Sequence, residues 1–117
     1  MNIALFTNDL MFQSRISQAV RADGNQLFVA RSLEQLKERL GEQLLNSAIF
    51  DLSFRNLDIG ATLEALKASY PTMVSIAYGP HVEIDALQGA RTAGVDHVLT
   101  RGQFDRDMAQ WLRVGEA

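Results

Sequence analysis

Polar and charged residues follow several short apolar runs of this chain, and their types could carry phosphate, metal or anion chemistry. Asp51 directly follows the apolar run AIF, and Thr7, Asn8 and Asp9 follow the run NIALF near the start of the chain. Arg101 follows a later run, near the C-terminus. A carboxylate can act as a nucleophile or as a metal ligand, and an arginine can contact an anion. Such chemistry requires that these residues meet in one crevice. Whether they do depends on how the strands and helices of the chain are arranged.

Several other chemistries find no support in the sequence. The chain has no cysteine, which excludes a thiolate nucleophile, a disulfide and a cysteine-based metal site. His81 and His97 lie in different segments without a second histidine at ligand spacing, so neither predicts a metal site or a catalytic base. There is no G-x-G-x-x-G or P-loop sequence. We therefore expect a protein that is not an enzyme and holds no cofactor.

Length and composition favour one domain over residues 1–117. With 47% hydrophobic residues the chain can bury one substantial core. The net charge of -3 and a pI near 5.2 argue against nucleic-acid and anionic-membrane partners, which need clustered basic residues. No run reaches the roughly 18 apolar residues of a membrane helix, and the start does not read as a signal peptide. We expect a cytoplasmic location.

Five apolar runs alternate with segments of helical spacing, and this alternation is typical of an α/β fold. It predicts a five-stranded parallel sheet with helices on both faces, a (βα)5 flavodoxin-like arrangement. The predicted strands are Asn2 to Phe6, Leu27 to Ala30, Ala48 to Asp51, Met73 to Ala77, and Val95 to Leu99. The predicted helical faces run through Phe12 to Val20, Leu33 to Leu44, Ile59 to Tyr70, Val82 to Ala93, and Phe104 to Leu112. In such sheets the functional crevice lies at the carboxyl ends of the strands.

In order and spacing the whole chain resembles the receiver domains of bacterial response regulators, which are CheY-like. The resemblance implies the strand order 2-1-3-4-5. It places Asp51 at the phosphoacceptor position, while Thr7 and Asn8 stand where two metal-binding acidic residues are expected. Counting from Pro71 places Ile76 at the position of a Thr or Ser, and counting from Gly94 places Arg101 at that of a lysine. The departures from the family pattern predict a degenerate receiver, or pseudo-receiver.

The residues of this crevice allow more than one interpretation: they are Thr7, Asn8, Asp9, Asp51, Ile76 and Arg101. Asp51 could be a phosphoacceptor, or a carboxylate capped by loop N–H groups or paired with Arg101. Thr7, Asn8 and Asp9 could line a polar pocket or cap the helix that follows. Asp9 and Asp51 are weak candidates for a magnesium site, because three carboxylates would compensate the ion better than two.

Three functions remain open at this stage. The first is a signalling module that acts by protein–protein contacts without phosphorylation, with a protein partner or a second copy of the chain. The resemblance implies a contact surface on the fourth helix, fifth strand and fifth helix, including Leu87, Val98 and Trp111; Tyr78, in the preceding loop, joins it as a candidate. The second is a phosphoacceptor modified at Asp51, with magnesium as cofactor. The third is a flavin-type small-molecule binder, although TNDLMF contains no glycine to cradle a phosphate.

Overall fold

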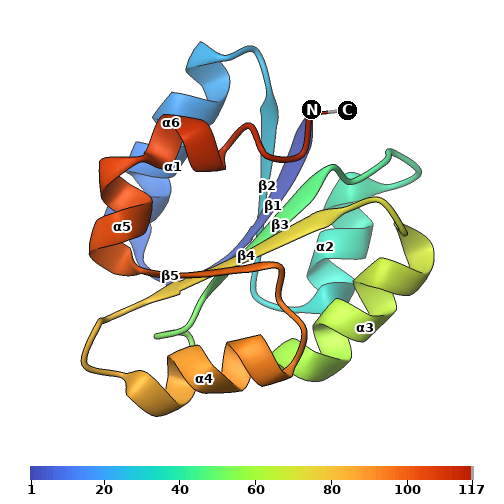
Figure 1. Cartoon of the computed structure of the whole chain (residues 1–117). Coiled ribbons are helices and arrows are strands. Elements are labelled where there is room, and N and C mark those ends of the chain that lie inside the picture. Colours follow the sequence, from blue (N-terminus) through green and yellow to red (C-terminus); the bar gives the residue numbers. More distant parts are fainter. Residues whose placement is uncertain (117) are drawn as a thin grey trace.

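The computed structural model describes residues 1–116 and shows a five-stranded parallel sheet of order β2-β1-β3-β4-β5 (Figure 1). Every strand pair is parallel, and the sheet and its strand order confirm the predicted fold. The strands are β1 (Asn2–Phe6), β2 (Gln26–Ala30), β3 (Ser47–Asp51), β4 (Val74–Gly79) and β5 (His97–Thr100).

Over residues 1–116, six helices cover the two faces of this sheet. They are α1 (Leu10–Ala22), α2 (Leu33–Leu40), α3 (Ile59–Ser69), α4 (Ile84–Thr92), α5 (Arg101–Arg106) and α6 (Met108–Trp111). Helices α1, α5 and α6 lie on one face, and α2, α3 and α4 lie on the other (Figure 1). Within residues 1–116, no helix combines the length and the apolar character needed to cross a membrane.

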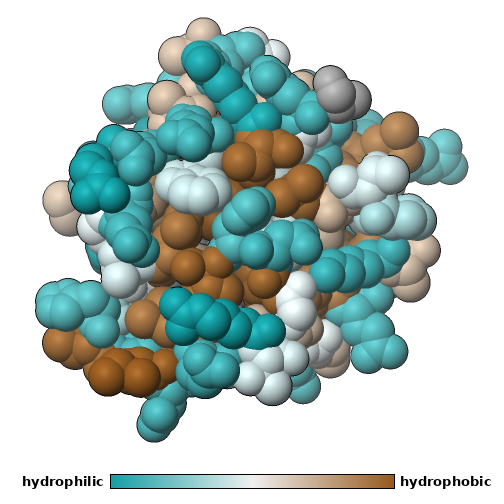
Figure 2. Space-filling view, in the orientation of Figure 1, coloured by the Kyte–Doolittle hydropathy of each residue, from teal (hydrophilic) through white to brown (hydrophobic). Residues whose placement is uncertain are grey.

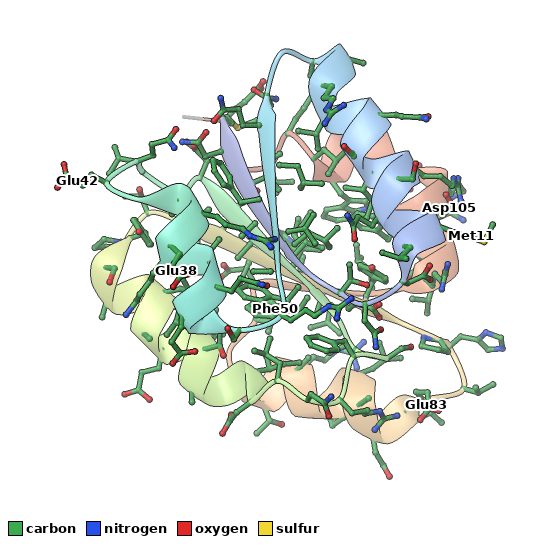
Figure 3. The ribbon with its side chains drawn as sticks, turned by 180° about the vertical axis from the view of Figure 1, so that it is seen from behind. Met11, Glu38, Glu42, Phe50, Glu83 and Asp105 are labelled. Atoms are coloured by element: carbon green, nitrogen blue, oxygen red, sulfur yellow. The ribbon has the colours of Figure 1, made fainter. Side chains whose placement is uncertain are left out.

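The side chains of the strands alternate between two apolar cores, one under each helical layer. Ile49 belongs to the core beneath α1 and α5, whereas its neighbours Ala48 and Phe50 belong to the core beneath α2, α3 and α4. All five residues of β3 are buried, as its run of apolar residues predicts for a central strand. Phe50 lies at the centre of the sheet in Figure 3 and stacks on Phe6 with ring centroids 5.1 Å apart.

Some elements begin or end at other residues than the sequence predicts. Helix α2 ends at Leu40 because Gly41 adopts a φ of +62°, so Leu44 lies outside the helix and is 75% exposed. Strand β4 continues to Gly79, two residues beyond its predicted end at Ala77. The last helical segment begins at Arg101 and is divided at Asp107 into α5 and α6.

Side-chain caps fix where the helices at the carboxyl edge of the sheet begin. The Ser32 hydroxyl accepts a hydrogen bond from the Gln35 N–H, and the Gln35 side chain accepts from the N–H of Arg31 rather than from that of Ser32. A complete capping box joins Thr100 and Gln103. This cap starts α5 directly after β5 and so places Arg101 at the carboxyl edge.

Candidate functional site

The side chain of Asp51 lies at the carboxyl edge of β3 and is held by two donors. The Thr7 hydroxyl, which follows β1, donates to Asp51 Oδ2 at 2.6 Å. The N–H of Ser53 donates to Asp51 Oδ1 at 2.9 Å. Asp51 is 5% exposed and Thr7 1% exposed, so this pairing is shielded from water. A buried carboxylate requires such donors, and here both of its oxygens have one.

Asp9 caps helix α1 and pairs with Arg101. Its Oδ1 accepts from the Phe12 N–H at 3.1 Å, and its Oδ2 lies 3.1 Å from the Arg101 guanidinium. The Phe12 N–H, followed by the Arg101 charge, lowers the pKa of Asp9 below its usual value. The guanidinium carbon of Arg101 also lies 4.3 Å from the centre of the Phe12 ring, in cation–π geometry. Capping is therefore the role of Asp9, and Arg101 contacts Asp9 rather than Asp51.

Tyr78, not Ile76, lies beside Asp51. In the parallel register of β3 and β4, Asp51 pairs with Tyr78 and Ile49 pairs with Ile76. Ile76 is 0% exposed in the core beneath α1 and α5, so the prediction that it lines the crevice is wrong. Counting from Pro71 ends two residues too early, because β4 extends further than the sequence suggests.

The Tyr78 ring fills the space between the crevice and helix α5. It stacks on Phe104 with centroids 4.9 Å apart and meets the edge of Phe12 at 5.2 Å. Its hydroxyl is buried and has no partner in hydrogen-bond geometry among the described residues. Burial, followed by the nearby Asp51 charge, raises the pKa of Tyr78, although the nearby Thr7 hydroxyl partly offsets this rise, so the phenol stays protonated. An aromatic cluster thus stands at the crevice position where the resemblance implies a small hydroxyl residue.

The residues present do not fit a magnesium ion. Magnesium requires several hard oxygen ligands in octahedral geometry. Each oxygen of Asp9 and Asp51 already has one partner, and the Arg101 cation that pairs with Asp9 would repel a metal ion. Among residues 1–116, no group of three histidine, aspartate or glutamate side chains is arranged to hold a metal. Of the two residues that stand where acidic residues are expected, Thr7 donates to Asp51 and Asn8 is exposed.

Two of the residues predicted to form a partner surface belong to the core. Tyr78 is 1% and Leu87 7% exposed, so their assignment to that surface is wrong. Tyr78 lies in the core beneath α1 and α5, and Leu87 lies in the core beneath α2, α3 and α4. Val98 and Trp111 are half-buried. The Trp111 ring lies 5.2 Å from His97, and His81 is exposed in the loop before α4.

The sequence did not single out Phe12 as a site residue, and it assigned Tyr78 to a partner surface rather than to the side of Asp51. Phe12 was assigned to a core face. Its position three residues after Asp9 is the spacing at which a capping side chain accepts from a main-chain N–H. Ser53 contributes its main-chain N–H, which agrees with the expectation that a loop N–H could cap Asp51. Tyr78 could have been found from its spacing of two residues from Ile76, since both lie on one face of a strand.

The order of the sheet and the place of Asp51 at its carboxyl edge define the receiver fold, of the CheY-like kind. Solved structures with this fold cover nearly the whole chain. The receiver domain of the TMAO respiratory system response regulator TorR is 16% identical, with a TM-score of 0.79 over 96% of this chain and 92% of that one. A receiver domain protein from Methanospirillum hungatei JF-1 is also 16% identical, with a TM-score of 0.72 over 98% and 95%.

A third similar structure is the CheY-like protein TadZ from Pseudomonas aeruginosa PAO1. It is 20% identical, with a TM-score of 0.73 over 98% of both chains. No family model matches the sequence, and a comparison with curated proteins gives no significant match. These likenesses establish the fold and leave the function to the residues of this chain.

Proposed function

We propose that the chain is a receiver-like signalling module that acts through protein–protein contacts and without phosphorylation of Asp51. The observation that carries this proposal is the pairing of Asp51 with the Thr7 hydroxyl at 2.6 Å in a buried setting. A nucleophilic carboxylate must expose an oxygen in line with the phosphoryl donor. Here one oxygen accepts from Thr7 and the other from the main chain of Ser53.

The electrostatic support for phosphoryl transfer is also weak in this crevice. Such transfer depends on positive charge at the phosphoryl oxygens, most of it from a metal ion. The Arg101 cation is engaged by Asp9, and the oxygens suited to a metal are already paired. The aromatic ring of Tyr78 lies beside Asp51 where a phosphoryl group would need room. Each of these features disfavours modification of Asp51.

Exposed apolar side chains at the carboxyl edge of the sheet support a protein partner. Met11 is 83%, Val82 69% and Ile84 71% exposed, on the first turn of α1 and around the start of α4. Figure 2 shows hydrophobic atoms gathered at the start of α4, and Figure 3 shows Met11 and Glu83 at the same edge. We call these three residues the apolar rim. Exposed apolar surface bordered by polar residues is typical of a protein contact.

A second copy of the chain is one candidate partner. A receiver domain of NtrC4 with the same fold, 15% identical and with a TM-score of 0.73, was solved as a dimer in its beryllofluoride-activated form. In this chain the pairing of Asp51 disfavours an activation step of that kind, so under this proposal a dimer would have to form without phosphorylation. The acidic balance, with 14 acidic and 11 basic residues, favours a protein partner over nucleic acid.

A phosphodonor assay tests the absence of phosphorylation. Wild-type protein and Asp51→Asn are incubated with acetyl phosphate and magnesium, beside a receiver domain with an intact acidic pair, and weighed by intact-mass spectrometry. We expect added phosphoryl mass on the control receiver only. Phosphoryl mass on the wild type that is lost in Asp51→Asn would replace this proposal with the phosphoacceptor function.

Surface variants test the contact function. Size-exclusion chromatography with light scattering and capture from native extract compare the wild type with Met11→Glu and Ile84→Glu. Leu44→Glu is a matched control, because Leu44 is equally exposed but precedes β3 at the opposite edge. We expect the rim variants to lose self-association or a reproducible partner and the control to retain it. A wild type that is monomeric and captures nothing reproducible contradicts the contact function.

A further inference from the structure

The edge strand β2 borders a cavity of about 340 Å³ between helices α1 and α2. Figure 3 shows β2 running between these two helices. Cavities of this size hold small organic ligands rather than single ions. Its walls combine the apolar side chains of Leu10 and Val29 with the polar side chains of Gln13, Arg31, Gln35 and Arg39. The cavity therefore offers apolar, amide and cationic contacts together.

The charge of this cavity is positive and uncompensated. No carboxylate is among its lining residues. Five of the nine arginines form ion pairs in the described part of the chain, at positions 15, 55, 101, 106 and 113. Two of the remaining four, Arg31 and Arg39, line this single cavity. In a chain of net charge -3, such a pairing of free guanidinium groups indicates a site for an anion.

Local hydrogen bonds fix the main chain at Arg31 and the guanidinium group of Arg39 at the cavity. The Gln35 side-chain carbonyl accepts from the Arg31 N–H at 2.8 Å, which leaves the Gln35 amide nitrogen free to donate. A guanidinium N–H of Arg39 donates to the Val29 carbonyl at the sheet edge. A guanidinium group has five N–H donors, so Arg39 keeps donors for a ligand after making this bond. The site is thus partly organised before any ligand binds.

We propose that this cavity binds a small phosphomonoester, with its phosphate between Arg31 and Arg39 and its organic part against Leu10 and Val29. A phosphomonoester carries about two negative charges at neutral pH, which matches the two guanidinium groups. Gln13 and Gln35 supply amide groups for polar atoms of the organic part. Thr7 also lines the cavity, but its hydroxyl donates to Asp51, and Asp51 itself is not a lining residue, so this inference does not depend on whether Asp51 is phosphorylated.

The test uses adenosine 5′-monophosphate, adenosine and inorganic phosphate as probes, with binding followed by NMR of the ¹⁵N-labelled full chain. We expect the monophosphate to shift the amide signals of residues 29–39 saturably and adenosine to shift none. Inorganic phosphate shifts the same signals at higher concentration. Added salt weakens binding, because the contact is ionic. Arg31→Gln and Arg39→Gln each weaken binding roughly tenfold, the range of one charge-assisted hydrogen bond.

Arg91→Gln is the matched control, because Arg91 is exposed on α4 and forms no ion pair in the described residues. Its binding should equal that of the wild type. The midpoint of thermal unfolding of each variant shows whether Arg39→Gln destabilises the sheet edge. If it does, the binding of Arg31→Gln alone tests the proposal. The proposal is overturned if neither phosphate probe gives saturable shifts, if adenosine binds as well as its monophosphate, or if Arg91→Gln weakens binding as much as Arg31→Gln.

Discussion

Replacing Thr7 with valine should destabilise the fold, because the Thr7 hydroxyl donates the shorter of the two hydrogen bonds to the buried Asp51 carboxylate. Thr7→Val keeps the shape of the side chain and removes the donor to Asp51 Oδ2 at 2.6 Å. It also removes the acceptor for the Asp9 N–H, which donates to Thr7 Oγ1 at 3.0 Å. One hydroxyl thus serves two polar groups at the carboxyl edge of β1.

The magnitude follows from these two bonds. A hydrogen bond to a charged group contributes about 1.5–3 kcal/mol, and a main-chain bond at a partly buried site contributes about 1 kcal/mol. We expect the free energy of unfolding to fall by about 2–4 kcal/mol, a large share of the roughly 5–15 kcal/mol of an ordinary domain. In urea this lowers the unfolding midpoint by roughly 1–2 M at the m-values of small domains.

The assay is urea unfolding followed by circular dichroism, with two controls. Thr7→Ser keeps the hydroxyl and should recover most of the loss. Thr62→Val changes an equally buried threonine on α3 whose hydroxyl is not bonded to a carboxylate in the part of the chain that the structure describes. A loss in Thr7→Val no larger than in Thr62→Val, or equal to that in Thr7→Ser, would refute the assigned role of the hydroxyl.

Two further predictions concern the neighbours of Asp51. Asp9→Asn keeps an oxygen for the Phe12 N–H but loses the pair with Arg101, so unfolding free energy should fall by less than about 1 kcal/mol at pH 7, and Asp9→Ala should lose about 1 kcal/mol more. The pKa of Asp9 in the folded state is lowered from 3.8, so the contribution of its carboxylate to the free energy of unfolding is present above pH 3.8 and is lost as pH falls through the folded pKa. Urea unfolding at several pH values should therefore show the stabilities of Asp9→Asn and the wild type converging in acid. A stability difference that stays constant with pH contradicts this. Tyr78→Phe removes a buried hydroxyl without a partner and should leave stability unchanged or raise it by up to about 1–2 kcal/mol, with Tyr70→Phe as control; a clear loss of stability would reveal a bond of that hydroxyl.

The alternation of apolar runs and helical segments predicts the architecture because both sides of the sheet are covered. β3 reads as an uninterrupted apolar run and is buried along its whole length, and Asp51 ends it at the expected edge. Caps at Asp9 and Ser32 were likewise readable, since a short polar side chain before an apolar stripe starts a helix. These features depend on local sequence and on the period of burial, which the chain itself displays.

The register between β3 and β4 could not be read in the same way. Ile76 and Tyr78 lie on one face of a strand, and both are apolar enough to enter the core beneath α1 and α5. Side chains on one face of a strand recur every two residues, so this period cannot show which of the two lies beside Asp51. Counting from Pro71 chose Ile76 because it assumed a fixed length for β4. Only the pairing of Asp51 with Tyr78 across the sheet resolves it.

The ring of Tyr78 changes what the carboxyl edge can do. A switch that responds to phosphorylation needs an element that moves when a phosphoryl group recruits a small hydroxyl side chain. Tyr78 is packed between Phe12 and Phe104, and Phe12 in turn lies beneath Arg101. Moving the phenol toward Asp51 would expose part of this aromatic cluster to water, and burial of aromatic rings is among the larger apolar terms in a core. This packing supports the proposal that the crevice does not act as a phosphorylation switch and that the chain acts through its surface.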